Sequence, residues 1–360
     1  MSEELFLTGV TGYIGSSLLK TWLDGTDDRI TVLVRGKREK GPEQRLAAVL
    51  ADLYPGTDTN RFAGRLDVVE GDVSFDRLGL EKSRWDAVAS RTTKIIHCAA
   101  AARFDLDIEA ARAVNVGGTR KMLELAGACG KLKTLDYIGT AYVAGKRSGL
   151  ILEDELDMGQ EHRNTYERSK MEAEKLVRSR IDGLPIAIMR PSIVICDSRT
   201  GRASDFNGFY RALRLYNRGM APVMPGDPDC RIDLVPVDYV TDAITTLSTL
   251  PASRGRCYHI TAGPENATPL AVIRDLASGH FGRKPFSIVS PKQFEAQVSA
   301  LAGRLSEDEM KILEELRRYM PYLETDLIFD DTNTRRDTGL EVPRVEDYFP
   351  AMARYIIEHD

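Results

Sequence analysis

Residues 5–15 read Leu-Phe-Leu-Thr-Gly-Val-Thr-Gly-Tyr-Ile-Gly, and this stretch decides the fold. The apolar run at 5–7 predicts a short buried strand. The apolar residues that follow recur at the spacing of one helix face, namely Ile14, Leu18, Leu19, Trp22 and Leu23. The glycines between strand and helix permit a sharp turn and let a ligand approach the backbone. A helix that begins there turns its free N–H groups toward an anion, and a pyrophosphate is the usual guest.

The spacing of these glycines is Gly-x-x-Gly-x-x-Gly, which differs from the Gly-x-Gly-x-x-Gly of ordinary dehydrogenases. A tight turn without a ligand has the same composition, but the flanking strand and helix favour a dinucleotide site. We therefore expect this turn to hold a cofactor through Gly9, Thr11, Gly12, Tyr13, Ile14 and Gly15.

Composition excludes several classes of partner. The chain has 360 residues, of which 42% are hydrophobic and 29% charged, with a net charge of −5. That charge gives no reason to expect nucleic acid or an anionic membrane, and no apolar run is long enough to span a bilayer. Five scattered cysteines predict reduced thiols in a cytoplasmic protein. The histidines show no ligand spacing, so no metal is predicted.

Strand and helix signals alternate through the first half of the chain. Further strand signals lie at 30–34, 68–73, 94–99, 134–138 and 185–189, with helical patterns between them, for example at 110–129 and 165–181. Such alternation predicts an α/β fold with a doubly wound, parallel, Rossmann-type sheet.

The alternation of strand and helix signals ends at about residue 197, and mostly loop and helix patterns follow. This change predicts a smaller, interwoven C-terminal substrate lobe. We assign 1–197 to the NADP(H)-binding domain, with returning segments at about 231–262. The segments 198–230 and 263–360 then form the substrate-binding lobe. Within it, Ser306 to Glu309 is typical of a capping box that opens a helix with a Met/Leu stripe. Such a stripe could pack in an ordinary hydrophobic core or form a lid over the substrate.

The residues after the second predicted strand bear on the choice of cofactor. Enzymes that prefer NAD carry Asp or Glu here to bind the ribose 2′-hydroxyl. This chain instead has Arg35, Lys37 and Arg38, with no carboxylate before Glu39. A guanidinium pairs with a phosphate, which a carboxylate would repel. We therefore predict NADPH, with Arg35 and Arg38 as the contacts to its 2′-phosphate.

Tyr166 and Lys170 stand four residues apart in a predicted helix, so both can point into one cleft. A phenol normally titrates near 10, and an adjacent ammonium is expected to lower its pKa, which makes the pair a workable general acid. Thr140 comes directly after the predicted strand at 134–138 and could hold a carbonyl oxygen beside Tyr166. Each of these residues alone also fits an ordinary structural role.

The order of motifs resembles the extended short-chain dehydrogenases/reductases. These motifs are the glycine turn, Asp72-Val73, Ala99-Ala100-Ala101, Asn115 to Thr119, Thr140, Tyr166 with Lys170, and Arg190-Pro191-Ser192. A narrower likeness to the fatty acyl-CoA reductase and thioester reductase branch rests on Leu33 to Arg35, Gly71 to Val73, Phe104, Gly139 to Gly145 and Val235 to Val240. The likeness is good over about 4–265 and fainter beyond. Where the family usually has Ser-Thr, this chain has Gly139-Thr140.

The resemblance implies a role for each matching residue. Thr140, Tyr166 and Lys170 would be catalytic, and Asn115 would help to order the site. The remaining cofactor contacts would come from Asp72 and Val73 at the adenine, Ala99 and Ala100 along the ribose, Lys170 at the nicotinamide ribose, and Pro191 and Ile193 past the carboxamide. Ala101 is a further expected cofactor contact.

The resemblance implies NADPH-dependent reduction of an acyl thioester to an aldehyde, with further reduction to the alcohol left open. The thioester would arrive on coenzyme A or on a separate acyl or peptidyl carrier protein. One alternative is an extended dehydrogenase or epimerase that acts on a ketone, a hydroxysteroid or a nucleotide sugar. The other is a non-catalytic NADP(H)-binding protein, which has no need of the Thr140, Tyr166 and Lys170 set. The acyl group and the oligomeric state are not predicted.

Overall fold

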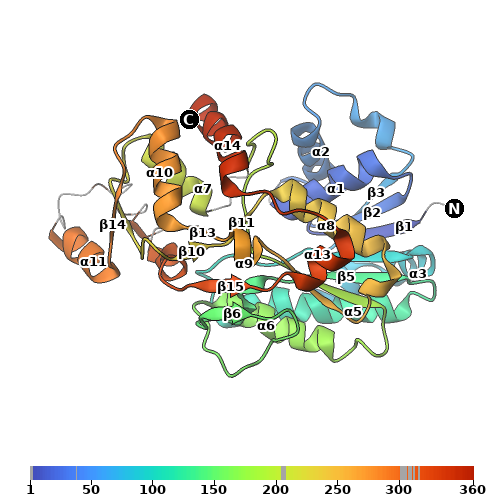
Figure 1. The fold of residues 1–360 in the computed structure, drawn as a ribbon. Helices are drawn as coiled ribbons and strands as arrows, with labels where there is room; N and C mark the ends of the chain where they lie inside the picture. The colour runs from blue at the N-terminus through green and yellow to red at the C-terminus, as the bar shows by residue number, and fades with distance from the viewer. Residues whose placement is uncertain are drawn as a thin grey trace.

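The computed structural model describes residues 3–37, 39–203, 208–300, 306, 310, 313–314 and 317–360. Its centre is a seven-stranded sheet in the order β12-β7-β5-β4-β1-β2-β3, and every neighbouring pair is parallel (Figure 1). The strands are β1 (Glu4–Thr8), β2 (Arg29–Val34), β3 (Leu66–Glu70), β4 (Lys94–His97), β5 (Thr134–Ile138), β7 (Ile186–Pro191) and β12 (Cys257–Ile260). The predicted Rossmann-type sheet is confirmed.

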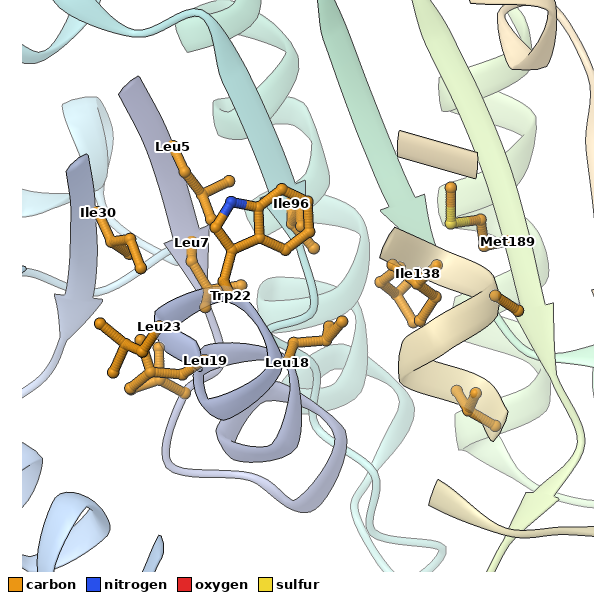
Figure 2. Packing of buried hydrophobic residues seen from close by; sticks show 14 of the residues in the cluster. Leu5, Leu7, Leu18, Leu19, Trp22, Leu23, Ile30, Ile96, Ile138 and Met189 are labelled. Carbon is orange, nitrogen blue, oxygen red and sulfur yellow. The ribbon is translucent and has the colours of Figure 1, made fainter. Parts of the chain in front are cut away.

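Helices cover both faces of this sheet, as its parallel strands require. One face carries α1 (Tyr13–Gly25), α2 (Pro42–Leu53) and α8 (Val237–Thr249). The other carries α3 (Lys82–Arg91), α5 (Gly118–Ala128) and α6 (Thr165–Arg178). Figure 2 shows how α1 packs: its apolar stripe, Leu18, Leu19, Trp22 and Leu23, faces Leu5, Leu7, Ile30 and Ile96 from the strands.

A second hydrophobic core lies in the C-terminal lobe, at the other end of the molecule (Figure 1). It is built mainly from α7 (Gly208–Asn217), α10 (Leu270–Phe281), α11 (Pro291–Ala300) and α14 (Val345–His359). Short strand pairs frame it: β8 (Ile193–Val194) with β11 (Leu234–Val235), β9 (Val223–Pro225) with β14 (Ser287–Val289), and β10 (Arg231–Ile232) with β13 (Thr268–Pro269).

The chain crosses between the two cores several times. After the first crossing, α8 and β12 return to the Rossmann sheet. Later, β15 (Leu327–Phe329) pairs with β6 (Gly149–Ile151), and α13 (Thr332–Thr338) packs on β12 and α8. The domain boundaries given above stay a prediction, and α13 lies nearer the sheet than the assignment of 263–360 to the lobe implies.

The remaining elements are short. They are α4 (Ile108–Arg112), α9 (Gly263–Asn266), η1 (Thr59–Phe62), η2 (Asp76–Gly79), the π-helical η3 (Ala113–Gly117), η4 (Ala141–Ala144), η5 (Pro251–Ser253) and η6 (Met320–Tyr322). The predicted capping box at 306–309 falls largely outside the described residues. Within the described part of the chain, every helix is too short or too polar to traverse a bilayer.

Candidate active site

The predicted site residues gather at the carboxyl edge of the sheet, where open α/β folds bind ligands. The glycine turn follows β1 there. Gly9 has a φ of +83°, and a Cβ on it would lie 2.7 Å from the backbone N of Ala99. A Cβ on Gly15 would lie 2.1 Å from the carbonyl oxygen of Gly9. The turn is therefore folded so tightly onto β4 and α1 that no side chain fits at either glycine.

The start of α1 fits a pyrophosphate. Gly12 caps this helix without any side-chain hydrogen bond, and the first turn carries no acidic residue. Thr11 and Gly12 are exposed, so the unpaired N–H groups and the positive end of the helix dipole remain open to an anion. The Tyr13 hydroxyl donates to the carbonyl of Arg202 at 3.2 Å, and Ile14 packs against the core. Because both side chains are engaged within the protein, we expect Tyr13 and Ile14 to contact a cofactor through their backbone.

Arg35 and Asp72 meet where β2 and β3 end. Nη1 of Arg35 lies 3.4 Å from Oδ2 of Asp72, and the Arg35 side chain is 58% exposed. Partial burial acts to raise the pKa of the Asp72 carboxyl, but hydrogen bonds from Ser74 and the Arg35 charge lower it overall. The guanidinium is therefore reachable from solvent, and its contact to a 2′-phosphate stays a prediction. Arg38 lies outside the described residues.

Val73 sits deeper than Asp72. Its side chain is buried, and a Cβ on Gly118 would lie 2.9 Å from its Cγ2. At the opposite part of the same edge, Pro191 ends β7 and is buried, while Ile193 in β8 is half-buried. All three lie at the carboxyl edge of the sheet, and their contacts to a cofactor stay a prediction.

Asn115 joins the loop after β4 to the helix of Tyr166. Its Oδ1 accepts from the Ala101 N–H at 2.8 Å, and its Nδ2 donates to Ser169 Oγ at 2.9 Å. The predicted helix at 110–129 is interrupted here by the π-helical turn η3, a feature often found at functional sites. Before it, the Ala99 N–H donates to Thr8 Oγ1 at 3.2 Å, and Ala100 is exposed. The alanine run is thus held from both sides.

Thr140 and Tyr166 come together from different elements. Thr140 follows β5, and its Oγ1 accepts from the Tyr142 N–H at 3.3 Å. Tyr166 is in the first turn of α6, which Asn164 caps by accepting from the Glu167 N–H at 2.9 Å. Burial raises the pKa of Tyr166 to about 12, and a hydrogen bond with the Thr140 side chain acts in the opposite direction. Half-buried Tyr166 therefore keeps its proton at neutral pH.

Lys170 lies one turn further along α6 and is buried. Its Nζ donates to the Ile138 carbonyl at 2.7 Å and stands 4.5 Å from the centroid of the Tyr137 ring. Burial lowers the pKa of Lys170 to about 8, against the opposing influence of Cys98 and Glu174. The expected lowering of the Tyr166 pKa by Lys170 is not found, because the ammonium points to β5 and burial dominates at the phenol.

An aromatic cluster centred on Phe104, which the sequence did not predict, lies beside Tyr166. The Phe104 ring lies 6.0 Å from the Tyr166 ring, measured between centroids, 5.4 Å from that of Tyr319 and 5.8 Å from that of Tyr322. Phe104 entered the sequence argument only as a family motif. Tyr319 and Tyr322 carry no local signal, because the residues that they contact are distant in the chain.

Comparison with known proteins agrees with this architecture. A family model of NAD-binding proteins described as "Male sterility protein" matches residues 7–244. A non-canonical nonribosomal peptide synthetase of a Cladobotryum species is 29% identical over 376 residues, which cover 98% of this chain and 36% of that protein. A putative fatty acyl-CoA reductase of Drosophila melanogaster is 28% identical over 320 residues, covering 77% of this chain and 59% of that one. The chain thus spans about a third of the first relative's length and somewhat over half of the second's.

Among solved structures, the terminal R domain from the myxalamid PKS-NRPS biosynthetic pathway superposes with a TM-score of 0.85. It is 29% identical, and the match covers 99% of this chain and 91% of that one. The likeness extends over both the sheet and the C-terminal lobe.

Proposed function

Because the chain belongs to the male sterility family of NAD-binding reductases, we propose that it reduces acyl thioesters to aldehydes with NADPH. The observation that carries this proposal is the placement of the Tyr166 phenol close enough to the Thr140 side chain to be influenced by it, with buried Lys170 one helix turn away. The pair lies at the sheet edge that also holds the glycine turn. A module that only bound a dinucleotide would have no use for a protonated phenol at that place.

The glycine turn and α1 would hold the pyrophosphate, and Asp72 the adenine end. The choice of NADPH over NADH is supported by Arg35, which directly follows β2 and whose guanidinium is exposed. The sequence has no Asp or Glu between the end of β2 and Glu39. Asp72, with which Arg35 pairs at 3.4 Å, lies after the end of β3. When bound, NADPH supplies a hydride to the carbonyl carbon of the substrate.

The residues of the chain stabilise the charge that develops on the carbonyl oxygen. Thr140 Oγ1 donates a hydrogen bond to that oxygen, and the Tyr166 hydroxyl donates a proton to it. The pKa of Tyr166, raised to about 12, keeps that proton available at neutral pH. Lys170 adds a buried positive charge one helix turn from Tyr166. The hemithioacetal formed in this way loses its thiol and leaves the aldehyde.

The relatives support a thioester as the substrate, since their names include a peptide synthetase and an acyl-CoA reductase. We propose that the acyl group arrives on coenzyme A or on a carrier protein, as the names of the two relatives suggest. The predicted cytoplasmic location and the possible second reduction to an alcohol stay predictions.

The test follows NADPH absorbance while purified protein meets a panel of acyl-CoA and acyl-phosphopantetheine thioesters. We expect consumption that depends on a thioester and falls at least about 1,000-fold in Tyr166→Phe, while the Kd for NADPH stays within about twofold. Retained activity in Tyr166→Phe would remove the phenol from the mechanism. Tight NADPH binding without consumption with any thioester would favour a ketone or a nucleotide sugar as substrate.

A further inference from the structure

Tyr322 connects the C-terminal lobe to the first turn of α6. Its hydroxyl donates to Glu167 Oε1 at 2.6 Å and accepts from Asn164 Nδ2 at 2.7 Å. Asn164 is the N-cap of α6, and Glu167 follows Tyr166 in the chain. Thus one side chain, 155 residues away from Glu167, bonds to positions on both sides of the proposed proton donor.

The carboxylate that receives this bond is fully buried. Glu167 is 0% exposed, and the Arg163 guanidinium lies 3.5 Å from its Oε1. The same guanidinium stands over the Tyr322 ring at 5.2 Å from its centroid. A buried carboxylate depends on its hydrogen bonds, because losing one leaves part of its charge uncompensated in an environment of low dielectric constant. Tyr322 therefore supplies one of the contacts that keep this turn of the helix in place.

The ring of Tyr322 reaches the two proposed hydrogen-bond donors through other aromatic side chains. It stacks on Phe104, with 5.8 Å between centroids and 26° between planes, and Phe104 in turn contacts Tyr166. It also makes a T-shaped contact with Tyr142, with 5.1 Å between centroids, and the Tyr142 N–H donates to Thr140 Oγ1. The hydroxyl and the ring of Tyr322 thus support Tyr166 and Thr140 by separate contacts.

We propose that Tyr322 is a positioning residue that couples the C-terminal lobe to the reacting pair, Tyr166 and Thr140. This inference rests on the proposed reductase function. It assigns a role in the reaction to η6, a segment that lies outside the Rossmann sheet. In this arrangement the two donors hold their mutual geometry only while η6 is docked on the first turn of α6.

The test uses Tyr322→Phe, which removes the hydroxyl and keeps the ring. Tyr216→Phe is the matched control, because the Tyr216 hydroxyl donates to the Lys284 carbonyl at 2.7 Å in the same lobe, away from Tyr166. We expect kcat for the preferred thioester to fall about 10- to 100-fold in Tyr322→Phe, with KM for NADPH within about twofold. Tyr216→Phe should retain kcat within about twofold.

A second measurement needs no substrate. Hydrogen–deuterium exchange of the amides at 163–168 should become at least about tenfold faster in Tyr322→Phe and stay unchanged in Tyr216→Phe, with the amides of β5 as the internal reference. If exchange is faster in Tyr322→Phe but the wild type reduces no thioester, the contact of η6 with α6 is supported and the proposed function is rejected. Unchanged exchange, or faster exchange with normal kcat, would overturn the positioning role.

Discussion

The Nζ of Lys170 lies 4.5 Å from the centroid of the Tyr137 ring, and no ion pair to this lysine is found among the described residues. A buried ammonium is costly without compensation, and here the Ile138 carbonyl and the π face of Tyr137 supply it. The other titratable groups that influence Lys170 or are influenced by it are Glu174 from α6, and His97 and Cys98 from the end of β4.

This arrangement predicts a shifted pH profile in Tyr137→Leu. The pKa of Lys170, lowered to about 8 by burial, means that the ammonium is lost as the pH rises through about 8, and kcat should fall there. Leucine removes the ring, disfavours the ammonium further and moves this alkaline limb to lower pH by about 0.5 to 1 unit. Tyr137→Phe keeps the ring face and should keep the limb in place. Identical profiles for all three proteins would contradict this role of the ring.

Arg35→Ala should weaken NADPH binding about 10- to 100-fold and leave NADH binding unchanged, because the loss concerns one charge-assisted contact to the 2′-phosphate. Arg29→Ala is the control, since Arg29 begins the same strand and its exposed side chain pairs only loosely, at 3.9 Å, with Glu4. Titration of each variant with both cofactors gives the Kd values. Equal losses for NADPH and NADH would assign Arg35 a general electrostatic effect instead.

Gly15→Ala should abolish detectable NADPH binding and cost about 3 kcal/mol of stability. The added methyl group would lie 2.1 Å from the carbonyl oxygen of Gly9, so the turn must open. Gly127→Ala offers a contrast inside α5, because position 127 is exposed and nothing lies within 4 Å of the added Cβ. It should stabilise the protein by about 0.5–1 kcal/mol. Urea unfolding and cofactor titration measure both effects, and a normally binding Gly15→Ala would contradict the turn geometry.

Asp136→Asn should be more stable than the wild type at pH 7 and much closer to it at pH 4. Asp136 is fully buried in β5, and burial raises its pKa to about 6 from 3.8. The folded state then binds the extra proton between these values, so wild-type stability falls as the pH rises toward 6. Asparagine lacks this titration, and the difference should reach about 2 kcal/mol. Urea unfolding at several pH values checks it, and a pH-independent difference would refute the assignment.

The sequence predicted those parts of the molecule that depend on neighbours in the chain. The turn at Gly9 to Gly15 and the strands of the sheet have local signatures, since glycines and buried runs mark them directly. The return of Cys257–Ile260 to the domain was likewise predicted, and it pairs with β7. Co-location of Thr140 and Tyr166 followed from the family motifs.

What the sequence left open depends on contacts between distant segments. Strands of two or three residues, such as β6 and β15, are too short to show a period, and they form only because they pair with each other. The same holds for Tyr322 and Glu167. The sequence predicted a lowered pKa for Tyr166, whereas burial raises it. The spacing of Tyr166 and Lys170 indicates that they are close together but not how deeply they are buried.

The position of β12 at the edge of the sheet bears on how the protein is made. During synthesis, β7 leaves the ribosome with its outer edge unpaired, and its partner follows only after the first part of the C-terminal lobe has been translated. A fragment that stops at residue 197 would keep this apolar edge open to other chains. The two cores are therefore a single unit of biosynthesis, and neither is a natural candidate for expression alone.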